Sequence, residues 1–186
     1  MKVLAILGSR NHEGQTARAT GALVSGAKGA GAEVESIFLT ELTVERCRQC
    51  DANGWGLCRR EGRCVIEDDF ARVVDGIRAA DAVVFGNPVY FGDLSESLKS
   101  FLDRLRRITR HEAGKVGLTG KPAVGVCVAG GGGGGAPNCC LLLERTLGTC
   151  GFEVLDMVPV RRQNLTMKLE VLGVVGRWLV ASRASS

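Results

Sequence analysis

The chain has 186 residues with a net charge of +4, a high glycine count of 26 and only 5% aromatic residues. This length suits one domain with a full hydrophobic core, and the scarcity of aromatic residues among dispersed basic ones argues against a nucleic-acid-binding surface. No apolar run approaches the roughly 18 residues of a membrane span, and the run after Lys2 is too short for a secretory leader, so we expect a cytoplasmic protein with neither nucleic acid nor membrane as a partner.

Apolar runs alternate with helix-length segments along the chain. The runs expected as strands are Lys2–Leu7, 33–39, 82–86, Pro122–Ala129 and 152–159, and the helical patterns cover 15–28, 67–80, 93–108, 138–149 and 167–181. Alternation of this kind predicts a parallel sheet with helices on both faces. Five strands in this order predict a flavodoxin-like three-layer α/β sandwich with strand order 2-1-3-4-5. We therefore expect a single domain over 1–186, with a cysteine-rich insertion at about 40–65 and a helical tail at about 164–186.

Residues 8–16, which follow the first strand and lead into a helix, have the composition of a phosphate site. A helix N-terminus offers unpaired N–H groups and a positive dipole end to an anion. Arg10 would add a guanidinium, and Ser9 and Thr16 would add hydroxyls. Neither a Walker ending nor a G-x-G-x-x-G fingerprint is present, which favours a terminal monophosphate over a pyrophosphate. The alternative is a polar turn without a ligand.

Two further loops follow the third and fourth strands, and ligands in such sheets bind beyond the carboxyl ends of the strands. Residues 87–92 contain Pro88, which stiffens the backbone, and the stackable rings of Tyr90 and Phe91, which suit a planar ligand. Residues 130–135 are six consecutive glycines, whose backbone could lie flat against a ligand and donate to its edge. The alternatives are aromatic side chains that fill the core and a flexible linker.

Together the three loops resemble the NAD(P)H-dependent FMN reductase family and its iron–sulfur flavoprotein branch. That family commonly has Gly-Ser-Pro-Arg…Gly-Asn-Thr, then Ser-Pro-Val-Tyr, then a Leu-Lys…Phe-Asp-Arg helix. The matching segments here are Gly8-Ser9-Arg10…Gly14-Gln15-Thr16, Asn87-Pro88-Val89-Tyr90-Phe91 and Leu98-Lys99-Ser100-Phe101-Leu102-Asp103-Arg104. The proline after the first serine is absent, and Gln15 stands where asparagine is usual. The resemblance covers roughly residues 1–152.

This resemblance implies that FMN is the ligand and that NAD(P)H is a co-substrate. The residues it implies for FMN are Ser9, Arg10, Gly14, Gln15 and Thr16 at the phosphate, Asn87, Pro88, Val89, Tyr90 and Phe91 at the ring, and Gly130, Gly131 and Gly132 at the ring's polar edge. The flavin would carry the chemistry, so no catalytic side chain is implied. Asp103 and Arg104 would form a structural ion pair, and family members commonly form homodimers or homotetramers.

Four cysteines, Cys47, Cys50, Cys58 and Cys64, fall within one irregular segment. In a reducing compartment such a group indicates metal or redox chemistry rather than a disulfide framework. Thiolates bind either a [4Fe–4S] cluster or zinc, and free thiols are the third alternative. The iron–sulfur branch has a compact cysteine group at this place, with a shorter spacing between its second and third cysteines. The other four cysteines are expected in the core.

Three functions follow from these patterns. The first is an FMN-binding oxidoreductase that takes hydride from NAD(P)H and passes electrons to flavin, quinone or another acceptor. The second is an iron–sulfur flavoprotein electron carrier that is reduced by ferredoxin. The third is a non-redox binding domain stabilised by zinc.

Overall fold

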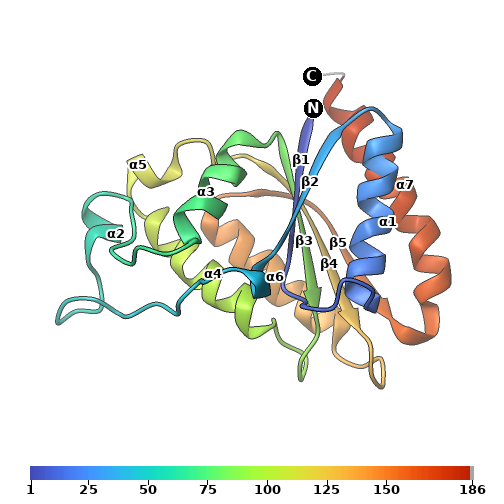
Figure 1. The fold of residues 1–186 in the computed structure, drawn as a ribbon, viewed down its shortest axis with the longest axis horizontal. Coiled ribbons are helices and arrows are strands. Elements are labelled where there is room, and N and C mark those ends of the chain that lie inside the picture. Colours follow the sequence, from blue (N-terminus) through green and yellow to red (C-terminus); the bar gives the residue numbers. More distant parts are fainter. Residues whose placement is uncertain (185–186) are drawn as a thin grey trace.

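The computed structural model describes residues 1–184 and contains one five-stranded parallel sheet in the order β2-β1-β3-β4-β5 (Figure 1). This arrangement confirms the flavodoxin-like fold expected from the sequence. All four strand pairings are parallel. The strands are β1 (Lys2–Leu7), β2 (Glu33–Phe38), β3 (Ala82–Pro88), β4 (Pro122–Ala129) and β5 (Glu153–Arg161).

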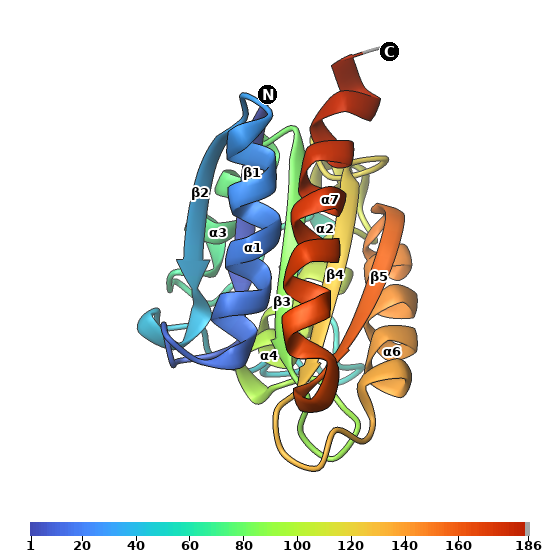
Figure 2. The ribbon, with the colours of Figure 1, turned by 90° about the vertical axis from the view of Figure 1, so that its right-hand side faces the viewer.

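Helices cover both faces of the sheet. Helices α1 and α7 lie side by side on one face, and α3, α4 and α6 lie on the other (Figures 1 and 2). The long helices are α1 (Gln15–Gly29), α3 (Phe70–Ala79), α4 (Glu96–Ile108), α6 (Ala136–Cys150) and α7 (Leu165–Ala184). Short helical turns occur at η1 (Leu39–Glu41), α2 (Leu57–Arg60), α5 (Glu112–Lys115) and η2 (Arg162–Asn164). The sequence did not predict α2 or α5, because four-residue helices carry no recognisable apolar period.

Each face of the sheet builds its own hydrophobic core because successive strand residues point to opposite sides. In β1, Leu4 and Ile6 join the core beneath α3, α4 and α6, whereas Val3 and Leu7 join the core beneath α1 and α7. All four side chains are at most 3% exposed. A central parallel strand is covered on both sides, which explains why β1 reads as a continuous apolar run.

The helical tail covers the chain's own core. Leu172 and Leu179 of α7 are fully buried against α1. The two helices approach closely because glycines face the partner backbone, and a Cβ on Gly26 would overlap the carbonyl of Gly173. The predicted tail extends to residue 186, and residues 185–186 lie outside the described part. Within residues 1–184 no helix is long and apolar enough to span a membrane.

Candidate functional site

The loop between β1 and α1 leaves the first turn of α1 open. Gly14 is the N-cap of this helix, and no side chain accepts a hydrogen bond from its first amides. Ser9 is 8% exposed and Thr16 is 5% exposed, whereas Arg10 is exposed. Gln15 is half-buried, and its Oε1 atom has no hydrogen-bond partner. The loop therefore combines free backbone donors, two buried hydroxyl side chains and one exposed cation.

The loop after β3 is a tight turn that projects an aromatic side chain. Tyr90 and Asp93 pair across the turn, with N···O distances of 3.2 and 3.0 Å. Phe91 and Gly92 between them have φ values of 52° and 82°, the left-handed pair of a type I′ turn. Phe91 is fully exposed and Tyr90 is 56% exposed, so neither ring fills the core. The alternative interpretation of this loop, in which both rings fill the core, is therefore wrong.

The glycine loop after β4 faces the Phe91 turn across an open cleft of about 460 Å³. Asn138 of α6 donates to the carbonyl of Gly92 at 3.0 Å, and Gln163 donates to the carbonyl of Gly132 at 3.1 Å. The first contact ties the Phe91 turn to α6, and the second holds the glycine loop at its third residue, which argues against a free linker. A Cβ on Gly131 or Gly132 would meet no atom within 4 Å. The cleft is lined by Val89, Phe91, Gly92, Ala129, Gly131, Gly132, Gly133, Gly134, Gly135 and Asn138.

The structure brings the three expected loops to one edge of the sheet, but it places Asn87 and Pro88 in β3 and buries them both. Asn87 is fully buried. Its amide nitrogen donates to the carbonyl of Pro88 at 2.8 Å and to Cys139 Sγ at 3.2 Å, and its oxygen accepts from the amide of Ser95 at 2.9 Å. Both ends of the side chain are used within the protein. Asn87 therefore holds the loop in place, and the side chains open to a ligand begin at Val89.

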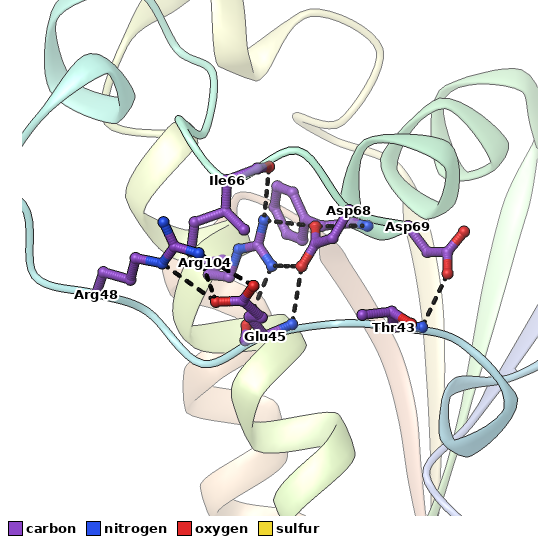
Figure 3. A network of polar contacts seen from close by, with 8 residues as sticks. Thr43, Glu45, Arg48, Ile66, Asp68, Asp69 and Arg104 are labelled. Atoms are coloured by element: carbon purple, nitrogen blue, oxygen red, sulfur yellow. Dashed lines mark hydrogen bonds and ion pairs between the residues drawn. The ribbon is translucent and has the colours of Figure 1, made fainter.

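A buried ion pair between α4 and the segment before α3 anchors the cysteine region (Figure 3). Arg104 and Asp68 have side chains 1% and 3% exposed, and the two guanidinium nitrogens of Arg104 lie 2.6 and 2.8 Å from the carboxylate oxygens. Arg104 also donates to the carbonyls of Glu45 and Ile66 at 3.1 and 3.4 Å. Its guanidinium stacks 4.2 Å from the ring centre of Phe70.

The expected pair between Asp103 and Arg104 is wrong. Asp103 instead binds Lys99 at 2.9 Å and Arg106 at 3.0 Å on the exposed side of α4. The physical reason is helical geometry, because residues three or four apart share a face and adjacent residues do not.

The ion pair keeps both of its groups charged. Burial by itself would raise the pKa of Asp68, but hydrogen bonds from Arg104 and from the backbone of Glu45 and Phe70 lower that pKa below its ordinary value of 3.8. Burial would likewise lower the pKa of Arg104, but Asp68 and the sulfur of Cys64 raise it. Arg104 and Cys64 both line the same small chamber.

Cys47, Cys50, Cys58 and Cys64 all line one small chamber with a cavity volume of about 20 Å³. Its wall is completed by Arg104 and Arg107 of α4 and by apolar side chains that include Leu57, Ile66 and Ile108. Within the described residues, no three His, Cys, Asp or Glu side chains stand close enough to hold a single metal ion. The structure therefore gathers the four predicted cysteines around a common space without converging them on one point.

The remaining four cysteines are buried, as expected. Cys127 lies in β4, and Cys139, Cys140 and Cys150 lie in α6. Burial raises the pKa of Cys150 to about 12, so this thiol is neutral and serves as a small apolar side chain. None of the four lines the chamber.

A model of the NADPH-dependent FMN reductase family matches residues 1–167. The chain belongs to this family. The match covers all three loops and the cysteine segment, so it includes every candidate site residue.

Two curated relatives of this family member are iron-sulfur flavoproteins. It is 36% identical over 127 residues to one from Methanocaldococcus jannaschii, covering 67% of this chain and 62% of the relative. It is 34% identical over 120 residues to one from Methanosarcina thermophila, covering 63% of this chain and 60% of the relative. The chain thus spans about three fifths of the length of these relatives.

Solved structures show the same fold at lower identity. The NAD(P)H:quinone oxidoreductase from Methanothermobacter marburgensis superposes with a TM-score of 0.71 at 22% identity, over 96% of both chains. A flavodoxin from the domain Archaea superposes with a TM-score of 0.65 at 13% identity, over the full length of both. These likenesses establish a flavodoxin-like fold for this FMN reductase family member.

Proposed function

We propose that this chain is an FMN-binding oxidoreductase that holds a [4Fe–4S] cluster in the cysteine chamber and passes electrons between the flavin and a partner. The observation that carries the proposal is the common chamber of Cys47, Cys50, Cys58 and Cys64, in a chain of the FMN reductase family. When bound, FMN accepts a hydride and releases electrons singly. The chain's own residues would bind the flavin, orient it and position the cluster.

The loops at the sheet edge fit FMN. Oε1 of Gln15 is buried without a partner, and the Gln15 side chain lies against Gly130, where the first and third loops meet. An amide oxygen accepts hydrogen bonds, so a ribityl hydroxyl would satisfy it. Ser9, Arg10 and Thr16 would bind the phosphate together with the first amides of α1.

At the ring end, the open space beside Gly131 and Gly132 would admit the edge of the isoalloxazine to the backbone. Val89, Tyr90 and Phe91 would contact the ring from the opposite loop.

The donor set of the chamber, four thiols, is the one that a four-iron cluster takes, and the cavity of about 20 Å³ means that the cysteine segment would open to admit it. Tetrahedral zinc requires four ligands within bonding distance of one point, and no three ligands within residues 1–184 meet that condition. In a four-iron cluster each cysteine binds a different iron, so the sulfurs need only surround a common space. Cys47, Cys50, Cys58 and Cys64 do so.

Helix α4 joins the two sites. Near its start, Ser97 Oγ donates to the carbonyl of Gly8 in the phosphate loop at 3.1 Å. Arg104 and Arg107, which line the cysteine chamber, follow about 10 and 15 Å further along the helix axis. A single rigid element therefore sets the distance between the proposed flavin and cluster sites.

Replacing Arg10 with alanine is expected to weaken FMN binding by about 1.5–3 kcal/mol, the size of a charge-assisted hydrogen bond. Titration of apoprotein with FMN, followed by quenching of flavin fluorescence, measures the change. Arg18→Ala is the matched control because Arg18 is also exposed but follows the first turn of α1. Equal affinities for the two variants would remove Arg10 from the phosphate site.

Replacing Cys58 with alanine is expected to abolish iron binding and leave FMN binding unchanged, because the two sites use different loops. Iron and flavin per chain are measured after anaerobic reconstitution. Cys150→Ala is the control, since this thiol is buried in α6 away from the chamber. Full iron content in Cys58→Ala would show that this cysteine is not a ligand.

A second candidate function is an NAD(P)H-dependent reductase with a flavin or quinone acceptor, which the description of the family favours. Anaerobic mixing with NADH or NADPH separates the candidates. Rapid bleaching of the flavin supports the nicotinamide-dependent enzyme. Slow bleaching, combined with fast reduction by a low-potential donor such as ferredoxin, supports the electron carrier.

An assembly of two or four chains remains part of the proposal. It is supported by an exposed apolar row on α7 formed by Met167, Val171, Val174 and Trp178.

A further inference from the structure

Two arginines on one face of α4 hold the cysteine segment. Arg104 and Arg107 are three residues apart and therefore lie on the same side of the helix. Arg104 binds the two ends of the segment, through the carbonyl of Glu45 before Cys47 and through Ile66 and Asp68 after Cys64. The segment is thus fixed at its entry and its exit.

Arg107 holds the middle of the same segment. Its guanidinium donates to the carbonyl of Gly54 and lies 4.3 Å from the ring centre of Trp55. A second contact to the ring comes from Arg59, at 5.5 Å. Gly54 and Trp55 belong to residues 51–57, the seven residues that separate Cys50 from Cys58.

Residues 51–57 form a closed loop that returns to its starting point. The amide of Gly54 donates to the carbonyl of Asp51 at 3.2 Å. At the other end, a Cβ on Gly56 would lie 2.9 Å from Cys50 Cβ, so only glycine permits this approach. The loop therefore brings Gly56, two residues before Cys58, back beside Cys50, and Arg107 is the side chain that ties the loop to the helix.

Each of these arginines also has a buried donor without a partner. The Nε atoms of Arg104 and Arg107 are both buried and make no hydrogen bond, and both side chains line the chamber. A buried donor without a partner destabilises the folded state. Thiolate and sulfide sulfurs accept hydrogen bonds, so an occupant of the chamber that carries sulfur and negative charge would satisfy both donors.

We propose that Arg107 is a positioning residue for the cysteine chamber: it holds residues 51–57 on α4 so that Cys58 faces the chamber, and its Nε–H donates to the sulfur of the cluster bound there. This inference rests on the proposed cluster. Arg107 binds no iron itself, and its effect is transmitted through the loop and through a hydrogen bond. Outer-shell partners of this kind typically contribute 10–100-fold to metal affinity.

The test compares Arg107→Ala with Arg106→Ala in reconstituted protein. Arg106 is the matched control because it is the adjacent residue of α4, pairs with Asp103 and lies outside the chamber lining. The rate of iron release to a chelator should rise about 10–100-fold in Arg107→Ala only. The midpoint potential of the cluster should fall in the same variant, because a cation and a donor are lost.

Two further measurements separate positioning from loss of folding. In apoprotein, alkylation of Cys58 by iodoacetamide should be faster in Arg107→Ala than in Arg106→Ala, with FMN affinity equal in both. Trp55→Ala removes the other half of the contact without changing α4 and should reproduce the faster iron release. Arg107→Lys keeps the charge but not the planar stacking, and should restore part of the parent behaviour.

Equal iron-release rates and potentials in the parent, Arg107→Ala and Arg106→Ala would overturn this inference while leaving the cluster in place. A parent protein that takes up no iron would overturn the proposed cluster and this inference with it.

Discussion

Asp68→Ala is expected to lower the free energy of unfolding by about 3–5 kcal/mol, because it leaves the buried Arg104 guanidinium without its counter-charge. The side chains of this pair are 3% and 1% exposed, so water cannot replace the carboxylate. Urea denaturation, followed by far-ultraviolet circular dichroism, measures the change. Since natural domains are typically stable by about 5–15 kcal/mol, this single substitution removes a large share of the total.

Two variants test the cause of this loss. Asp69→Ala removes the neighbouring carboxylate, which is 34% exposed and accepts one hydrogen bond from the amide of Thr43 at 2.8 Å. Its expected cost is about 1 kcal/mol. Asp68→Ala combined with Arg104→Met removes both buried charges and should recover much of the stability. A double variant less stable than Asp68→Ala would show that the unpaired charge is not the cause.

The same ion pair predicts how the free energy of unfolding depends on pH under acidic conditions. The pKa of Asp68 is lowered in the folded state, so its contribution is fully present above the ordinary value of 3.8 and is lost as pH falls through the folded-state pKa. The stability difference between the parent and Asp68→Ala should therefore narrow below about pH 3.8. If the stability difference between the parent and Asp68→Ala stays constant down to the pH at which the protein unfolds, the lowered pKa of Asp68 is contradicted.

Gly26→Ala is expected to destabilise the protein by about 3 kcal/mol, at the upper end of the range for overpacking. A Cβ at this position of α1 would overlap the backbone carbonyl of Gly173 in α7. A backbone carbonyl inside a helix cannot rotate away as a flexible side chain can, so the two helices must separate. Thermal and urea unfolding measure the loss.

The matched control is Gly21→Ala in the same helix. A Cβ on Gly21 would meet no atom within 4 Å, so the substitution should stabilise the helix by about 0.5–1 kcal/mol. The two substitutions should therefore change the free energy of unfolding in opposite directions, although both replace a glycine by alanine in the same helix. Equal effects would mean that α1 and α7 are not in close backbone contact.

The sheet could be predicted because each buried parallel strand appears in the sequence as an apolar run. β1 and β4 have the expected ends, and strand order followed from the alternation of strands and helices. The sequence pattern predicts that β3 ends at residue 86, which is too early, because Asn87 and Pro88 resemble the start of a loop. Pairing with Cys127 and Val128 of β4 extends the strand through both residues.

The three loops at the sheet edge could be predicted, but the residues that support the sites could not. Arg104 pairs with Asp68, which is 36 residues away in the sequence, and no local pattern identifies such a partner. The sequence suggested Asp103 because it is adjacent, and helical geometry directs that side chain elsewhere. The role of Arg107 depends in the same way on where residues 51–57 fold, which their spacing alone does not specify.

The central claim is that one chain binds FMN at the sheet edge and an iron–sulfur cluster in the cysteine chamber. Its most direct test is the absorption spectrum of the protein purified without oxygen, together with iron and zinc analysis. We predict flavin bands with a broad shoulder in the visible range and about four irons per chain. Flavin bands with no iron would contradict the cluster, and a colourless protein would contradict both cofactors.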